Sequence, residues 1–265
     1  MSTDQFRLGQ YPTPQWVVEA LLQRYFPDLG AGDVVIDPSC GPGRFLLALP
    51  AETTAIGVEI DPALAAQAHR LTGRRIIVGD FASVEIAAEP TLILGNPPFK
   101  LALIDRFLER AHALLPDGGR VGFILPTYVF QTAGRVEAYR ERWSIAQDMI
   151  PRNIYPGLKL PLMFANFTKD RRRVLVGLAL YAETAAVQRL PRRVRDLLEA
   201  TGDSAWRAVV HYALEQLGGE ARLDEIYAVV ADCRPTHNAW WRAQIRKVVR
   251  RDFVRTGPAR YALAA

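Results

Sequence analysis

Four short apolar runs, each ending on an acid or followed within two residues by an acid or an amide, alternate with helical patterns along the first hundred residues. They occupy residues 33–37, 54–60, 75–80 and 91–94. Strands that alternate with helices build mostly parallel sheets, whose carboxyl ends meet at one edge, where ligands bind in open α/β folds. The sequence therefore predicts an α/β sheet that gathers four polar residues at one edge. They are Asp37, Glu59, Asp80 and Asn96.

The alternation continues through the next eighty residues. Helical patterns and apolar runs follow one another at residues 100–115, 121–125, 135–142 and 144–150. Two further apolar runs, 160–168 and 174–181, are joined by a short charged tip and predict a β-hairpin. We expect a mostly parallel, seven-stranded sheet with helices on both faces and this antiparallel hairpin at one edge.

Residues 201–265 differ in pattern from what precedes them. Three helical patterns, at residues 204–217, 223–231 and 238–251, are followed by a short strand pair at 252–263. Three helices and a β-hairpin of this size match a winged helix-turn-helix, whose third helix enters a major groove. We therefore expect a catalytic domain at 1–185, a basic linker at 186–200 and a DNA-binding domain at 201–265.

The third helix of this small domain divides into a buried and an exposed side. Trp241, Ile245 and Val248 fit its buried stripe. The side chains left to contact nucleic acid are Arg242, Gln244, Arg246 and Lys247. Winged helices also serve as protein-binding modules, and the pattern leaves that alternative open.

Positive charge is concentrated in the second half of the chain. Residues 1–150 hold 13 Lys and Arg against 17 Asp and Glu, whereas residues 151–265 hold 20 against 11. A basic half joined to a mildly acidic one suggests that an anionic polymer docks on one side, although solvated arginines give similar counts.

The remaining composition favours a cytoplasmic protein. No window reaches the roughly 18 uninterrupted apolar residues of a membrane span, and the polar start resembles no signal peptide. The two cysteines, Cys40 and Cys233, are too few for a disulfide framework or a zinc site, and the four histidines are scattered. We therefore expect no metal and no membrane partner.

A glycine-containing turn joins the first strand to the next helix. Gly41 and Gly43 lack the Cβ atom that would block a ligand from the backbone, and Asp37 ends the strand before them. Glu59 follows about 20 residues later, where an acid accepts the ribose hydroxyls of a nucleoside. Asp80 would accept from an adenine amine, and Phe81 would pack on the ring. Each acid alone could instead cap a helix.

The segment Asn96-Pro97-Pro98-Phe99 follows the fourth strand. The Asn96 side-chain oxygen and the Pro97 carbonyl can each accept one N–H of an amino group held beside the flat face of the Phe99 ring. An amine on an aromatic ring is a poor nucleophile because its lone pair is delocalised into the ring, so two acceptors favour a pyramidal nitrogen aimed at an electrophile. Taken alone, the two prolines could also mark an ordinary turn.

Five segments in this order resemble the gamma group of S-adenosylmethionine-dependent amino-methyltransferases, which methylate N6 of adenine in DNA. They are Tyr11-Pro12-Thr13-Pro14, residues 37–43, Val58-Glu59-Ile60-Asp61, Gly79-Asp80-Phe81 and Asn96-Pro97-Pro98-Phe99. The similarity covers roughly residues 10–182 and implies a Rossmann-like class I methyltransferase fold.

The resemblance also implies roles for individual residues. Tyr11, Thr13 and Pro14 would line the methionine end of S-adenosyl-L-methionine with the glycine turn, and Ile60 would lie against its adenine. The expected cofactor site comprises Tyr11, Thr13, Pro14, Asp37, Pro38, Ser39, Cys40, Gly41, Gly43, Phe45, Glu59, Ile60, Asp80 and Phe81. Thr13 is also expected to cap a helix whose first residue is Pro14.

Base flipping would bring the target adenine to Phe99, which stacks on it. The resemblance implies a second aromatic from the hairpin strand, for which Phe167 is the candidate and Phe164 the alternative. Lys159, Arg171 and Arg172 complete the nucleic-acid contacts expected near the hairpin.

Departures from the gamma group leave other hypotheses open. A compact winged-helix candidate replaces the usual longer recognition region, which is compatible with a short recognition site read by a monomer or with help from a second protomer in a homodimer. The same amine geometry serves RNA, and Asn-Pro-Pro-aromatic also occurs in enzymes that methylate glutamine side chains of proteins. A regulator without catalysis is a further hypothesis, against which the intact Asn96 argues.

Overall fold

The computed structural model describes residues 13–263 apart from 156, 179, 202–203 and 236–238. The chain divides into two compact units, Met1–Ala179 and Leu180–Ala265. The division falls six residues before the expected end of the catalytic domain. No helix within these described ranges is long and apolar enough to cross a membrane.

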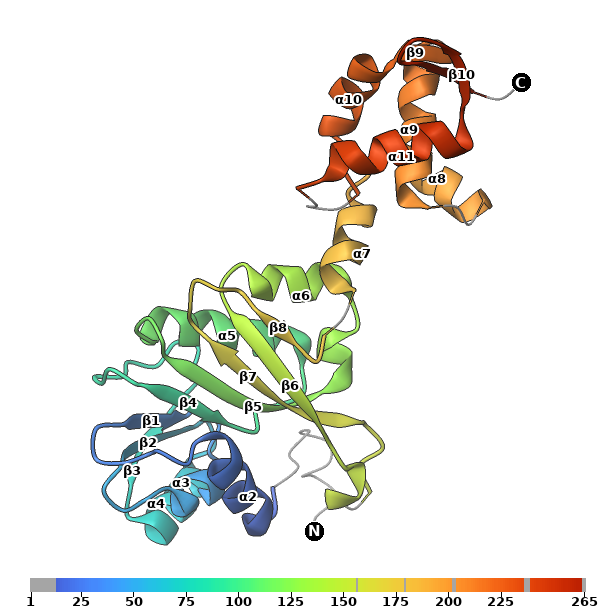
Figure 1. Ribbon diagram of the computed structural model, residues 1–265. Coiled ribbons are helices and arrows are strands. Elements are labelled where there is room, and N and C mark those ends of the chain that lie inside the picture. Colours follow the sequence, from blue (N-terminus) through green and yellow to red (C-terminus); the bar gives the residue numbers. More distant parts are fainter. Residues whose placement is uncertain (1–12, 156, 179, 202–203, 236–238, 264–265) are drawn as a thin grey trace. The chain divides into compact units, whose positions relative to one another are not determined.

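An eight-stranded sheet forms the first unit (Figure 1), one strand more than expected. Its spatial order is β3-β2-β1-β4-β5-β7-β6-β8. The strands are β1 (Val34–Asp37), β2 (Thr54–Glu59), β3 (Arg75–Val78), β4 (Leu92–Gly95), β5 (Arg120–Pro126), β6 (Ser144–Ile150), β7 (Leu162–Thr168) and β8 (Leu175–Val176). Strands β1 to β5 pair in parallel, β7 is antiparallel to β5 and β6, and β8 is parallel to β6.

The prediction that residues 160–168 and 174–181 pair as a β-hairpin at the edge of the sheet is wrong. β7 lies between β5 and β6 and pairs along its whole length with both, so neither of its edges is open to the next run. That run forms only the two-residue β8 beside β6, and α7 (Tyr181–Gln188) begins soon after it. The apolar pattern was correct for β7 but could not identify its partners.

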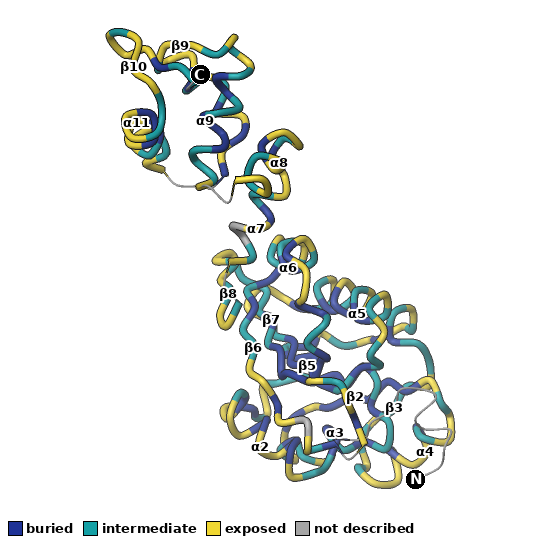
Figure 2. The backbone as a smooth tube through the Cα atoms, turned by 90° about the vertical axis from the view of Figure 1, so that its right-hand side faces the viewer, coloured by how far each residue is buried: buried dark blue, intermediate teal, exposed yellow. Residues whose placement is uncertain are grey.

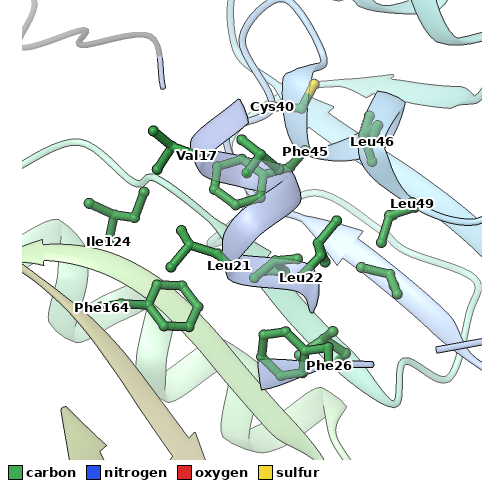
Figure 3. Packing of buried hydrophobic residues seen from close by; sticks show 14 of the residues in the cluster. Val17, Leu21, Leu22, Phe26, Cys40, Phe45, Leu46, Leu49, Ile124 and Phe164 are labelled. Carbon is green, nitrogen blue, oxygen red and sulfur yellow. The ribbon is translucent and has the colours of Figure 1, made fainter. Parts of the chain in front are cut away.

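Helices cover both faces of this sheet, as expected (Figure 1). The helices of the unit are α2 (Gln15–Tyr25), α3 (Arg44–Ala48), α4 (Pro62–Thr72), α5 (Leu101–Leu114) and α6 (Ala133–Arg140), with 3-10 turns at Thr127–Phe130 and Arg152–Ile154. Helices α2, α3 and α4 lie on one face, and α5 and α6 on the other. Figure 3 shows Val17, Leu21 and Leu22 of α2 packed against Phe45 of α3 and against Phe164 of β7.

The second unit has its own hydrophobic core. It contains α7, α8 (Arg192–Thr201), α9 (Ala205–Gln216), β9 (Glu220–Arg222), α10 (Leu223–Ala231), α11 (Trp241–Asp252), β10 (Val254–Gly257) and β11 (Arg260–Ala262). The three expected helices and the strand pair are present. The third strand, β9, pairs antiparallel with β11 and was not expected. Dark segments in Figure 2 mark the buried sides of α9 and α11.

The segment expected to be a basic linker is mostly helical. α7 and α8 account for most of residues 186–200, and Leu190 and Val194 are buried in the core of the second unit. The segment is basic because of Arg189, Arg192, Arg193 and Arg195, but Val194, Leu197 and Leu198 give α8 an apolar side that packs against that core. Trp241 also packs there, partly buried, which agrees with its expected place in the buried stripe.

Candidate active site at the carboxyl edge of the sheet

Strands β1 and β4 lie side by side although they are not consecutive in the chain, so the strand order reverses between them. Open α/β sheets bind ligands at such a switch point, outside the carboxyl ends of their strands. Asp37 ends β1 and Asn96 directly follows β4, while Glu59 ends the neighbouring β2. Of the four polar residues expected at one edge, Asp37 and Asn96 therefore flank the switch point, and Glu59 lies at the end of the strand next to it.

The glycine turn is tied to β2 by two hydrogen bonds. The Cys40 N–H donates to the Val58 carbonyl at 2.9 Å, and the Gly41 N–H donates to Glu59 Oε2 at 2.8 Å. Gly43 has φ +90°, and a Cβ there would lie 2.9 Å from Thr72 Cγ2, so both conformation and packing require glycine. A Cβ on Gly41 would instead meet no atom within 4 Å, which leaves open space beside the turn.

Glu59 is buried, with 5% of its surface exposed. Its second oxygen, Oε1, accepts from the Asp61 N–H at 3.0 Å, so the carboxylate is fixed from both sides. Each carboxylate oxygen has two acceptor positions, so a further hydroxyl can still bind. Ile60, the next residue, is 69% exposed and offers an apolar surface beside the carboxylate.

Asp37 is the most buried acid of this edge, with 1% of its surface exposed. Its Oδ1 accepts from the Ser39 N–H at 3.2 Å. Burial raises the pKa of Asp37 to about 8, and the nearby charge of Glu59 acts in the same direction. A Cβ on Gly95 would lie 2.7 Å from Asp37 Oδ1, so glycine at the end of β4 makes room for this carboxyl group.

Asn96 is held by a residue that precedes α2. Its Nδ2 donates to Thr13 Oγ1 at 3.2 Å, and the Tyr155 hydroxyl donates to the same oxygen at 3.1 Å. Ser39 Oγ also approaches the Asn96 carbonyl at 3.5 Å. The expectation that Thr13 caps α2 is wrong, because Pro14 is the cap residue and the Thr13 side chain binds Asn96 instead.

Phe99 is half-buried and packs against the edge of the core shared by α2 and α3. Its carbonyl accepts from the Tyr128 hydroxyl at 2.5 Å. Tyr128 lies in the turn that follows β5, so it reaches the site from the same edge as Asn96. The sequence did not predict Tyr128 or Tyr155, because they do not end a strand as the acids do: Tyr128 lies two residues after β5, and Tyr155 lies five residues after β6, beyond a 3-10 turn.

Comparison with solved structures identifies the fold of the first unit. A Listeria monocytogenes protein assigned to the class I S-adenosylmethionine-dependent methyltransferases superposes with a TM-score of 0.53 at 15% identity, covering 66% of each chain. The first unit has a class I methyltransferase fold. The resemblance noted in the sequence is confirmed at this level, and S-adenosylmethionine is the cofactor of the fold.

Sequence comparisons also find methyltransferases. Residues 2–113 match the model of an uncharacterised methyltransferase family, DUF6094. The type II methyltransferase M.TthHB8I of Thermus thermophilus is 26% identical over 210 residues, which are 66% of this chain and 47% of that protein. The type II methyltransferase M.CvrRI of Paramecium bursaria Chlorella virus XZ-6E is 37% identical over 68 residues, 24% of this chain and 18% of that protein. The chain thus spans about half the length of the first relative.

Several expected site residues of the methyltransferase unit belong to its core. Phe81 is fully buried and packs edge-to-face on Phe107 of α5, so it presents no ring to an adenine, contrary to expectation. Phe45 is also buried in the core. Asp80 lies two residues beyond β3, where Oδ1 accepts from the Ala82 N–H at 2.9 Å and Oδ2 faces Arg106 at 3.4 Å. Tyr11 lies outside the described residues.

The two phenylalanines of β7 are also unavailable to a base. Phe167 is fully buried among Phe130, Tyr139 and Trp143. Phe164 is fully buried on the opposite face, 4.8 Å from the ring of Tyr25 between centroids. Both aromatic candidates for the second stacking position are therefore wrong.

The three basic residues expected to contact nucleic acid near the hairpin do not lie together: two lie where β5 begins, and one lies where β5 ends. Arg171 and Arg172 follow Thr168, which pairs with Arg120 at the start of β5, so they lie at the edge opposite to Asn96. Lys159 is exposed and precedes Leu162, which pairs with Pro126 at the end of β5. Lys159 alone of the three lies at the edge that carries the candidate site.

Helix α11 of the second unit has a basic exposed side. Arg242, Arg246 and Lys247 are exposed, as is Arg250, and no carboxylate in the described part of the chain pairs with them. The Arg242 guanidinium lies 5.2 Å from the Trp241 ring centroid and 5.7 Å from that of Tyr227. Gln244, also expected to contact nucleic acid, is half-buried.

Some other arginines of the second unit form ion pairs with acids. Arg193 pairs with Glu215 on α9, Arg260 with Glu220 on β9, and Arg251 with Asp252 at the end of α11 itself. Four cations without an acidic partner among the described residues thus lie on one side of α11, and further exposed arginines without such a partner, Arg189, Arg195, Arg234 and Arg255, lie elsewhere in the unit. Among the residues that the structure describes, no group of three His, Cys, Asp or Glu is placed to hold a metal ion.

Proposed function

We propose that this protein transfers the methyl group of S-adenosylmethionine to the exocyclic N6 amine of adenine in DNA. One observation carries the proposal: the Asn96 amide lies at the switch point of a methyltransferase sheet, with its nitrogen bound to Thr13 at 3.2 Å. With the nitrogen directed at Thr13, the amide oxygen is the end that can accept an N–H from a substrate. The Pro97 carbonyl supplies a second acceptor one residue later.

The residues at the edge fit the cofactor. Glu59 would accept the ribose hydroxyls, the exposed Ile60 would lie against the adenine, and the open side of Gly41 leaves room for the chain between them. The methionine end would reach Thr13 and the buried Asp37, whose negative form suits the cofactor's cationic groups. When bound, the cofactor supplies an electrophilic methyl group on a sulfonium sulfur.

The chain's own residues would orient the acceptor amine. Asn96 Oδ1 and the Pro97 carbonyl each accept one N–H, which draws the amine hydrogens to one side and turns the nitrogen lone pair toward the methyl group. A direct displacement needs no strong base first, because the proton leaves nitrogen after the transfer. Alignment therefore supplies much of the rate enhancement. Phe99, held at its carbonyl by Tyr128, would stack on the extruded adenine.

The second unit would supply DNA affinity as a winged helix-turn-helix. Arg242, Arg246, Lys247 and Arg250 on α11 have no acidic partner among the described residues, so their charge remains available to phosphates. Arg242 is preorganised over two aromatic rings, which lowers the entropy lost when it binds. Two relatives named type II methyltransferases agree with a DNA substrate. Methylation of RNA at the same amine is the alternative.

The proposal is tested by following a labelled methyl group. The full chain is incubated with methyl-labelled S-adenosylmethionine and, in separate reactions, unmethylated genomic DNA, structured RNA or cell-extract protein. We expect label in DNA, recovered as N6-methyldeoxyadenosine after digestion, and none with Asn96→Ala. Label found only in RNA or in protein glutamine would replace the proposed substrate, and label on cytosine would refute the assignment of adenine.

A further inference from the structure

We infer that Tyr155 is a positioning residue for the methyl transfer. It acts through Thr13 to hold the Asn96 amide with its nitrogen turned away from the substrate and its oxygen turned toward it. The inference deepens the proposed function and rests on it for the identity of the substrate amine. Tyr155 itself is not expected to contact either the amine or the cofactor.

Three distant parts of the chain meet at one oxygen atom. Thr13 precedes α2, Asn96 follows β4, and Tyr155 follows the 3-10 turn after β6. The Tyr155 hydroxyl donates to Thr13 Oγ1 at 3.1 Å across 142 residues of sequence, and Asn96 Nδ2 donates to the same oxygen at 3.2 Å across 83 residues. A hydroxyl oxygen has two acceptor positions, and these two donors can occupy both.

Burial protects the two hydrogen bonds at Thr13 Oγ1 from competition by water. Thr13 is 4% exposed and Tyr155 is 3% exposed, so water competes little for their hydrogen bonds. Burial also raises the pKa of Tyr155 to about 12, which keeps the phenol protonated and therefore a donor. With Tyr155 donating, the Thr13 oxygen stays in place as an acceptor for the amide nitrogen.

The orientation of the amide decides whether Asn96 can act. An asparagine amide has an acceptor at one end and a donor at the other, and rotation by half a turn exchanges them. The rotated form would point an NH2 group at the substrate amine, where two donors would oppose each other. Loss of the phenol lets the Thr13 hydroxyl turn and donate, which stabilises the rotated form.

Tyr155→Phe removes only the hydroxyl and keeps the buried ring. One neutral hydrogen bond contributes about 1 kcal/mol, so we expect kcat to fall about fivefold or more, with KM for the cofactor changed less than twofold. Tyr139→Phe is the matched control, because it removes a hydroxyl bonded to Asp105 at 2.5 Å in the same unit. The control should lose comparable stability and keep its kcat.

A double-mutant cycle separates positioning from general stability. In a Thr13→Val background the acceptor is absent, so adding Tyr155→Phe should lower kcat no further. Thr13→Ser keeps the acceptor and should keep the dependence on Tyr155. Equal losses from Tyr155→Phe in the wild-type and Thr13→Val backgrounds would overturn the inference.

A second readout does not depend on the substrate. The Asn96 side-chain NH2 signals in a 15N-labelled protein are identified by their loss in Asn96→Ala. Tyr155→Phe should shift these signals and speed their exchange with solvent severalfold, whereas Tyr139→Phe should not. Unchanged signals in Tyr155→Phe would overturn the inference even in an active enzyme, while altered signals in a protein that methylates no adenine would refute only the proposed function.

Discussion

Cofactor binding should release a proton from Asp37. Burial raises the pKa of this carboxyl group to about 8. At pH 7 such a group is about nine-tenths protonated. A bound cofactor would bring a sulfonium and an ammonium group to this edge, and opposite charges at short range lower a carboxyl pKa by about 1–3 units.

The size of the effect follows from these values. If the bound cofactor lowers the pKa of Asp37 from about 8 to about 6, the carboxyl group releases about 0.8 of a proton at pH 7. At pH 9 it is already ionised and releases only about 0.1 of a proton. Affinity for the cofactor should therefore rise with pH up to about 8 and then level off.

Calorimetric titration in buffers of different ionisation enthalpy measures this proton directly. The amino group of the cofactor also titrates near neutral pH, so the quantity to compare is the difference between the wild type and Asp37→Asn. We expect that difference to be about 0.8 of a proton at pH 7 and close to zero at pH 9. Equal proton release from both proteins at pH 7 would show that Asp37 does not change its ionisation.

Three further outcomes are expected. Without cofactor, the folded-state pKa of Asp37 lies above its ordinary value of 3.8, so the free energy of unfolding should fall as pH rises toward about 8, by at most about 1.4 kcal/mol per pH unit. Denaturant titrations should show that Asp37→Asn flattens this dependence, and an unchanged slope would contradict the raised pKa. Gly43→Ala should cost about 1–3 kcal/mol of stability because its Cβ meets α4 at φ +90°, whereas Gly134→Ala, where the Cβ meets nothing, should not destabilise; equal effects would refute the packing argument. Arg242→Ala should weaken DNA binding and reduce its salt slope by about one, while Arg193→Ala, whose guanidinium is already paired with an acid, should change neither; the reverse order would remove α11 as the DNA-binding surface.

Residues that end a strand could be predicted well. Asp37, Glu59 and Asn96 were placed at one edge because an apolar run shows where a strand ends, and all parallel strands end on the same side. That logic needs no knowledge of strand order. It does not reach Tyr128 and Tyr155, which lie two and five residues beyond the ends of β5 and β6.

Residues inside strands and turns could not be predicted in the same way. β7 lies between two strands and is covered on both faces, so Phe164 and Phe167 are both buried although they point to opposite sides. Alternation along a sequence shows only that two faces exist. Phe81 likewise needed the position of α5 before it could be assigned to the core.

The bond between Thr13 and Asn96 shows a second limit. A threonine directly before a helix, with a proline as the next residue, is a common capping pattern, and the local sequence at Thr13 and Pro14 favoured that role. The side chain instead serves a partner 83 residues away, because the packing of α2 against the sheet brings it beside β4. Tertiary contacts thus replaced a local preference at a position of the candidate active site.

The central claim is that the Asn96 amide and the Pro97 carbonyl orient an adenine amine for methylation. Nucleoside analysis of DNA incubated with S-adenosylmethionine and either the wild type or Asn96→Ala tests it most directly. We predict N6-methyldeoxyadenosine with the wild type and at least a hundredfold less with the variant, with cofactor affinity unchanged within about twofold. Equal amounts of N6-methyldeoxyadenosine from both proteins would contradict the account.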